Sequence, residues 1–186
     1  MRSSNTPRID GLALVTLALM FFMLIKVISD QPDGRAVAAA PPEATATPVD
    51  NPDEVLPPYP SYILTQGPHG QSYGQLAIDL TAGKGAEVLS PINGVVTALY
   101  VDGLGNTTLI IENDHYQVTL LHGQYSVQVG DRLIAGQPVG VESNQGNTVD
   151  ARGISCRGRD CGYHTHLNIF DKSLGANVNP LDLFPK

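Results

Sequence analysis

The sequence predicts a mainly β domain over residues 61–186, preceded by an apolar segment and a proline-rich linker. Apolar and polar residues alternate with a period of two in several short runs, as in half-buried strands. Glycine, asparagine and aspartate bound these runs, and no stretch of the domain repeats apolar residues at helical spacing. A segment of this length can bury one compact hydrophobic core.

Five runs in this domain are expected to form strands: residues 75–80, 94–101, 107–112, 116–121 and 164–170. The turn sequences at 91–94, 102–105 and 113–115 suit tight connections between antiparallel neighbours. Residues 142–160 are polar and rich in glycine, so we expect them to form a long surface loop. Loops of that length in small domains usually have a functional role.

The N-terminal part is expected to cross or enter a membrane. Residues 11–29 form an apolar run close to the roughly 20 residues that span a bilayer as a helix. Arg2 and Arg8 precede it, which favours residues 1–10 on the cytoplasmic side. A small-x-small motif at 36–38 lies farther from the run than a signal peptidase site normally does. We therefore expect an uncleaved transmembrane anchor, with a cleaved signal and a secreted product as the alternative.

Residues 30–60 are rich in proline, alanine, threonine and acidic side chains, and are expected to form an extended linker. The domain at 61–186 would then lie on the periplasmic or extracellular face of the membrane. The chain has a net charge of −7 and no basic cluster, which argues against a nucleic-acid partner.

Two cysteines, Cys156 and Cys161, lie in the part expected to be exported. A disulfide is the default there, because exported proteins fold under oxidising conditions. Two alternatives remain open from the sequence: free thiols, or a zinc knuckle built with His164 and His166.

Four side chains that bind metals or transfer protons fall at or near expected strand ends: Asp79, His122, His164 and His166. In a strand His164 and His166 point to the same face, a spacing that a metal site can use. Each has a simpler interpretation alone, such as a turn aspartate or a surface histidine. Taken together, they indicate a metal or proton-transfer site.

Seven short pieces follow one another along the domain: AIDL at 77–80, GAEV at 85–88, PINGVV at 91–96, LH at 121–122, VGD at 129–131, AGQPVG at 135–140 and GYHTHL at 162–167. In this order they resemble the lysostaphin-type zinc metallopeptidases, also called the LytM type, which cut bacterial cell-wall peptides. The resemblance implies a barrel-sandwich-like β domain of the duplicated hybrid motif type, and it implies a Zn²⁺ cofactor. By the same resemblance, Asp79 and His166 bind the zinc, while His122 and His164 are catalytic.

The first zinc ligand is where this chain departs from the family pattern. The usual position, four residues before the aspartate, is occupied by Gln75, and glutamine is a poor zinc ligand. Either the metal is lost or another histidine replaces it, and His69 is the evident substitute, since some relatives carry an inserted segment here. Leu120 and Asn168 also depart from the pattern, at positions where a tyrosine and a glutamate are frequent. His115 matches nothing and is expected to be exposed.

Together with the expected anchor at 11–29, the resemblance implies a membrane-tethered zinc endopeptidase that hydrolyses peptide bonds of peptidoglycan cross-links. In that arrangement two histidines and a carboxylate leave one zinc position open for a reactive water. The alternative is a non-catalytic domain of the same fold that binds and regulates a partner wall hydrolase. A carrier or sugar-binding β domain with incidental histidines is a third interpretation.

Overall fold

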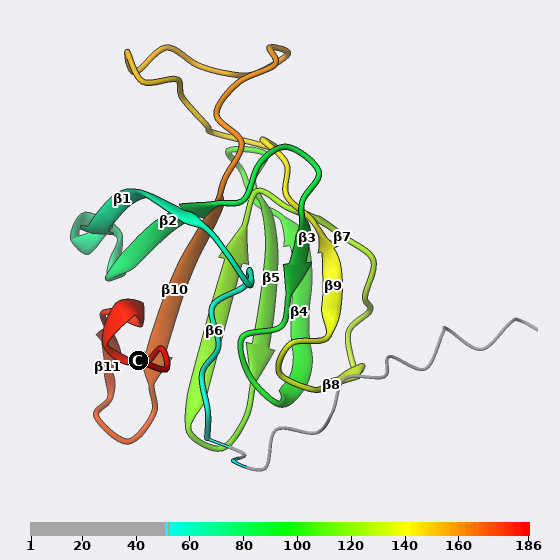
Figure 1. The fold of residues 1–186 in the computed structure, drawn as a ribbon, viewed down its shortest axis with the longest axis vertical. Coiled ribbons are helices and arrows are strands. Elements are labelled where there is room, and N and C mark those ends of the chain that lie inside the picture. Colours follow the sequence, from blue (N-terminus) through cyan, green and yellow to red (C-terminus); the bar gives the residue numbers. More distant parts are fainter. Residues whose placement is uncertain (1–50, 52) are drawn as a thin grey trace, which may run out of the picture. The chain divides into compact units, whose positions relative to one another are not determined.

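The computed structural model describes residue 51 and residues 53–186, and the chain in this part is built from strands (Figure 1). In chain order the elements are β1 (Ile63–His69), the 3-10 turn η1 (Gln71–Tyr73), β2 (Ala77–Thr81), β3 (Glu87–Leu89), β4 (Gly94–Val101), β5 (Thr107–Glu112), β6 (Tyr116–Leu121), β7 (Gln124–Tyr125), β8 (Arg132–Leu133), β9 (Pro138–Val141), β10 (Thr165–Asp171), β11 (Ala176–Val178) and the 3-10 turn η2 (Pro180–Asp182). The expected mainly β class is confirmed.

The strands form two antiparallel sheets. The larger has the order β1-β2-β10-β6-β5-β4-β8, with β11 paired to β10, and the smaller has the order β3-β9-β7. The chain therefore brings β10, late in the sequence, between β2 and β6 (Figure 1). This position of β10 places residues that are far apart in the sequence on adjacent strands.

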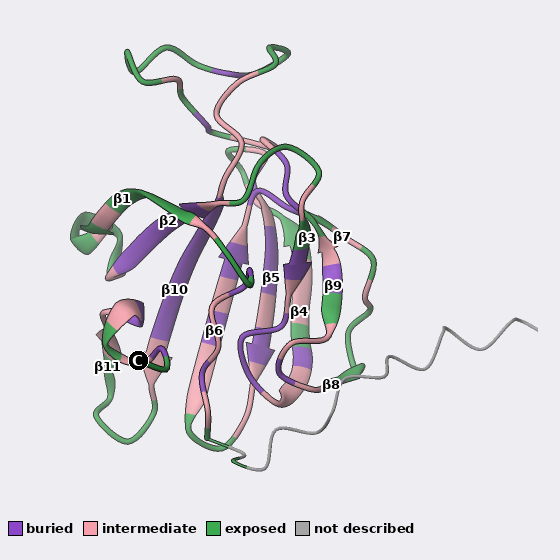
Figure 2. Cartoon of the chain, viewed as in Figure 1, coloured by how far each residue is buried: buried purple, intermediate pink, exposed green. Residues whose placement is uncertain are grey.

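Alternation along the strands separates a buried face of the large sheet from a polar one. Ile78 and Leu80 on β2 and Leu167 and Ile169 on β10 are fully buried in one hydrophobic core. Val88 of the smaller sheet belongs to the same core, so the two sheets share one apolar interior (Figure 2). Successive side chains of a strand point to opposite faces, so the residues between these apolar positions lie on the other side of the sheet.

Three of the five predicted strands have the observed bounds, and the other two are shifted by one or two residues. The exact matches are β4, β5 and β6, while 75–80 is observed as β2 and 164–170 as β10. The turns at 102–105 and 113–115 join antiparallel neighbours, as expected. The prediction omitted β1, β3 and β9, together with the very short strands, because few apolar residues alternate in them.

Two expectations about how the strands connect are wrong. The strands do not close into a barrel, because the large sheet has free ends at β1 and β8. The turn at 91–94 does not join sheet neighbours either, since β3 and β4 belong to different sheets. Gly94 begins β4 at a point where an added Cβ would lie 2.6 Å from the Glu112 carbonyl oxygen. A glycine is needed there because the backbones approach so closely.

The described residues that precede β1 pack on the domain. Val55 and Tyr59 are only 2% and 1% exposed, and both belong to the hydrophobic core. The predicted membrane segment at 11–29 and most of the predicted linker at 30–60 lie outside the described residues. Among the residues that the structure describes, no helix is long and apolar enough to cross a bilayer.

Glu142 links the smaller sheet to β2, and its loss is expected to destabilise the domain. Its side chain is buried, and its two oxygens accept hydrogen bonds from Thr81 Oγ1 at 2.6 Å and from the Ala82 N–H at 2.8 Å. Glu142→Ala removes both hydrogen bonds, at a cost of about 1–3 kcal/mol. Denaturant unfolding measures the change, with the exposed Glu87→Ala as the control. Equal stability of the two variants would contradict this role.

The disulfide expected between Cys156 and Cys161 is present, with the two Cα atoms 5.5 Å apart. It closes a short segment of the loop that leads into β10. Removing both sulfurs in a Cys156→Ala/Cys161→Ala variant is expected to lower the free energy of unfolding by about 2 kcal/mol. The reason is that the unfolded chain gains entropy when this short loop is no longer closed. Thermal denaturation with and without reductant measures this. The variant should be insensitive to reductant, and a wild type equally insensitive would argue against the effect.

Candidate metal centre

Asp79 and His166 face each other across adjacent strands on the polar side of the large sheet. Asp79 is the central residue of β2, and the register between β2 and β10 pairs it with His166. His69 is the last residue of β1 and pairs with Ala77 at the neighbouring edge. Asp79 is therefore not the turn residue of the simpler interpretation. Three strands bring the three side chains together.

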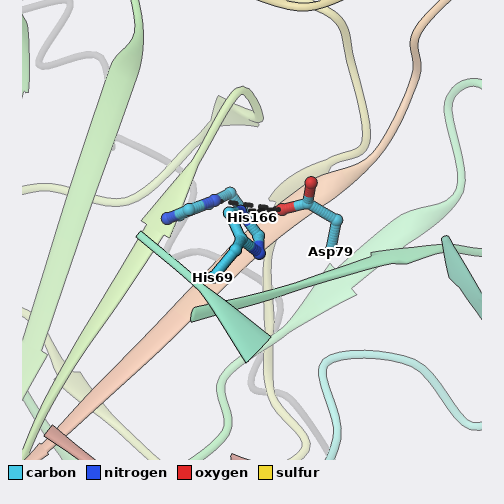
Figure 3. A group of neighbouring side chains, drawn as sticks. All are labelled: His69, Asp79 and His166. Carbon is cyan, nitrogen blue, oxygen red and sulfur yellow. Dashed lines mark hydrogen bonds and ion pairs between the residues drawn. The ribbon is translucent and has the colours of Figure 1, made fainter. Parts of the chain in front are cut away.

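The three side chains point toward one another (Figure 3). Asp79 Oδ1 lies 3.0 Å from His166 Nδ1 and 3.5 Å from His69 Nε2. Each residue offers a ligand atom, and these atoms all lie within 4.8 Å of one another. Ligands about 2.0–2.2 Å from a tetrahedral zinc are roughly 3.4 Å apart, so the spacing fits one zinc ion. Two imidazole nitrogens and one carboxylate oxygen are also donors that zinc favours.

The orientation of His69 is set by a backbone carbonyl of its own strand, β1. Its Nδ1–H donates to the Gly67 carbonyl oxygen at 2.9 Å. A carbonyl oxygen only accepts hydrogen bonds, so the proton of the neutral ring is on Nδ1 and Nε2 carries the free lone pair. That lone pair is the one directed at Asp79, so His69 points into the site and is able to bind a metal.

His122 follows β6 in a left-handed backbone conformation, with φ of 72°. Among the described residues it is the one non-glycine with positive φ. Its N–H donates to the Thr107 carbonyl at 3.0 Å, and its ring Nδ1–H donates to the Gln145 carbonyl at 2.8 Å. Such backbone geometry costs about 1–3 kcal/mol and is common at functional sites. The carbonyl contact leaves Nε2 as the unprotonated nitrogen.

His164 lies beside His122 and is oriented in the same way. Their ring centroids are 4.6 Å apart, and the His122 centroid is 6.3 Å from that of His166. His164 Nδ1–H donates to the Gly162 carbonyl at 2.9 Å, and its Nε2 is 3.7 Å from Asp79 Oδ2. The two histidines that the sequence assigned to catalysis therefore adjoin the three assigned to the metal.

Burial and neighbouring charges shift the pKa values at this site. Burial lowers the pKa of His122 to about 4, and repulsion from His164 adds to the effect. His122 is therefore a neutral imidazole at pH 7. Burial of Asp79 would raise its pKa, but the hydrogen bond with His166 and the charges of His164, His166 and His69 outweigh it and lower that pKa. Asp79 is therefore a carboxylate at neutral pH.

Gln75 does not occupy a ligand position, although it stands four residues before Asp79. Its Oε1 lies 2.9 Å from His166 Nε2, on the side of that ring opposite Nδ1. From the sequence, Gln75 was recognised only as a poor ligand. The carbonyl groups of Gln145 and Gly162, which orient His122 and His164, could not be predicted, because every residue has a backbone carbonyl. Leu120 is fully buried in the core, so it makes no surface available to a substrate.

The remaining cysteine and histidine predictions have clear outcomes. The zinc knuckle is wrong, because the two cysteine sulfurs bond each other and leave no thiolate for a metal. His115 is exposed, as expected, and its Nε2 lies 3.2 Å from Asp53 Oδ1 at the surface.

Solved structures similar to this chain share its fold. A zinc containing peptidase from Vibrio cholerae matches with a TM-score of 0.54 and 20% identity over 70% of this chain and 40% of its own. A chain of the SpoIIQ–SpoIIIAH pore forming complex matches with a TM-score of 0.54 and 18% identity over 73% and 94%. Lysostaphin from Staphylococcus simulans matches with a TM-score of 0.50 and 16% identity over 71% and 52%. This chain thus spans less than two thirds of the Vibrio peptidase and of lysostaphin.

A comparison with curated proteins found no significant match. The model of peptidase family M23 matches residues 73–180, which is more than half of the chain and includes β2, β10 and four of the five site residues. The sequence pieces, the paired sheets and the histidine and aspartate cluster all agree with that match. The chain belongs to peptidase family M23, the lysostaphin and LytM type of peptidase.

Proposed function

We propose that this chain is a zinc metalloendopeptidase that hydrolyses peptide bonds in peptidoglycan cross-links. The observation that carries the proposal is the convergence of donor atoms from His69, Asp79 and His166 beside the unprotonated nitrogens of His122 and His164. When bound by the first three residues, zinc supplies a water of lowered pKa, near 7, and polarises the scissile carbonyl.

In the proposed reaction His122 acts as the proton acceptor. It is neutral at pH 7, its Nδ1 proton is held by the Gln145 carbonyl, and its Nε2 lone pair is therefore available for a proton from the attacking water. His164 shares this orientation, with Nδ1–H on the Gly162 carbonyl. It is placed to stabilise negative charge on the substrate and to return a proton to the leaving amine.

The zinc content of the purified chain after chelation and repletion tests the metal assignment. We expect about one zinc per chain in the wild type and a large loss in His69→Ala, with His115→Ala as the matched control on the surface. Unchanged zinc in His69→Ala would remove His69 from the site.

Release of new amino groups from isolated cell walls tests the substrate. We expect release by the zinc-loaded wild type and none after chelation. A zinc-loaded chain that releases none would instead support a non-catalytic domain that binds and regulates a partner wall hydrolase.

We also propose that the domain is tethered outside the cytoplasm by the apolar segment at 11–29. This rests on the length of that run and on the preceding Arg2 and Arg8. The part of the predicted linker at 30–50, about twenty residues at about 3.1 Å each, would let the domain reach roughly 60 Å from the membrane. Fractionation of cells and protease access from outside test this, and a soluble cytoplasmic pool alone would contradict it.

A further inference from the structure

The amide of Gln75 is directed at one of the proposed metal ligands. Its Oε1 lies 2.9 Å from His166 Nε2, while His166 Nδ1 lies 3.0 Å from Asp79 Oδ1. A carboxamide oxygen only accepts hydrogen bonds, so it holds a proton on Nε2. Nδ1 faces the Asp79 carboxylate, whose oxygen also accepts a hydrogen bond, and a metal bound by Asp79 would take the place of the proton there. The amide therefore selects which nitrogen of His166 is available to a metal.

The turn between β1 and β2 seats Gln75 in this position. The N–H groups of Gln75 and Tyr73 both donate to the Gly70 carbonyl, at 3.1 Å and 2.8 Å. Gly70 has a φ of 92°, and an added Cβ would lie only 3.1 Å from the Gln75 Cβ. A side chain at position 70 is thus disfavoured both by the backbone conformation and by the contact with Gln75.

Asn168 holds the same turn from β10. It is buried, and its Oδ1 accepts a hydrogen bond from the Leu76 N–H at 2.9 Å. Its Nδ2 donates to Asn177 Oδ1 at 2.8 Å, and Asn177 Nδ2 in turn donates to the Gly74 carbonyl. Both chain neighbours of Gln75 are therefore fixed by side-chain amides. Asn168 also shares its strand face with His166, because the two are separated by one residue.

We propose that Gln75 is a positioning residue that holds the proton on His166 Nε2 and fixes the orientation of that ring, and that Asn168 and Asn177 fix Gln75. This inference rests on the proposed zinc site. It gives two departures from the family pattern one explanation. Asn168 fixes the backbone next to Gln75, and the Gln75 amide contacts His166. Because His69 takes the place of the first ligand, Gln75 is free to contact the side of the His166 ring that faces away from the proposed metal.

Zinc affinity, measured by competition with a chelator, tests the role of Gln75. Gln75→Met keeps the length of the side chain and removes its strong acceptor, so we expect a loss of about 10–100-fold in affinity, the usual effect of removing the partner of a metal-binding histidine. Gln75→Glu restores an oxygen acceptor and is expected to restore affinity. Gln71→Met, an exposed position on the same turn, is the matched control and should not change affinity.

Nitrogen-15 NMR of histidine-labelled protein gives a second measurement that does not depend on activity. We expect a hydrogen-bonded, slowly exchanging proton on His166 Nε2 in the wild type and in Gln75→Glu, and its loss in Gln75→Met. Zinc affinity and an Nε2 proton that are both unchanged in Gln75→Met would overturn the inference. If the wild type binds no zinc, the proposed function fails, while the Nε2 proton of the metal-free chain still tests Gln75.

A double-mutant cycle tests the link to Asn168. We expect Asn168→Ala to lower zinc affinity, and the double variant with Gln75→Met to lose little more than the stronger single variant, because both changes remove the same contact. Losses of zinc affinity that add fully in the double variant would overturn the link between Asn168 and Gln75. Thermal denaturation of each variant identifies any that fails to fold.

Discussion

Asp79→Asn is expected to remove zinc from the chain and to lower hydrolysis of its peptide substrate by about 10³-fold or more. The carboxylate supplies the one negative charge of the three-residue donor set, and its Oδ1 is the atom nearest to both His69 Nε2 and His166 Nδ1. Without the metal the pKa of the attacking water is no longer lowered to about 7, so hydroxide is scarce at neutral pH.

Metal analysis and a peptide hydrolysis assay on the same preparation measure this effect. Asparagine keeps the shape of the buried side chain, so the variant should retain the fold. Asp114→Asn, at an exposed turn, is the control and should keep both zinc and activity. Full zinc content in Asp79→Asn would show that the carboxylate is not needed to hold the ion.

His122→Asn is expected to keep zinc and to lower kcat by about 10²–10⁴-fold, the usual contribution of a positioned acid or base. Asparagine tolerates the left-handed backbone at this position better than other non-glycine residues do, so the change removes the imidazole with little added strain. The side-chain amide has no nitrogen that accepts a proton at neutral pH.

The same metal analysis and hydrolysis assay separate this role from zinc binding. His115→Asn, the exposed histidine, is the control and should behave as the wild type. Loss of zinc in His122→Asn would place His122 among the ligands, and unchanged kcat would remove it from the reaction.

The sequence predicted the strands whose side chains alternate clearly and missed those that lie at the edges. β4, β5 and β6 carry enough alternating apolar residues to be recognised with their exact bounds. β1 has no buried residue, because it lies at the free edge of the large sheet, so no apolar pattern marked it. Its omission mattered for the site, since β1 carries His69. Sequence spacing alone left open whether His69 pointed toward Asp79.

By itself, the sequence determined the β class, the family resemblance and the identity of the polar residues that gather on one face of the sheet. Alternation within a strand is a local property, so it is legible in the residue order. Only the tertiary structure decided how distant strands pair. The pairing of β10 with β2 sets His166 opposite Asp79, the turn from β1 brings in His69, and Gln75 reaches His166 instead of a metal. Those contacts join residues up to 97 positions apart, from His69 to His166, and such proximity is fixed by strand order and register rather than by any local pattern.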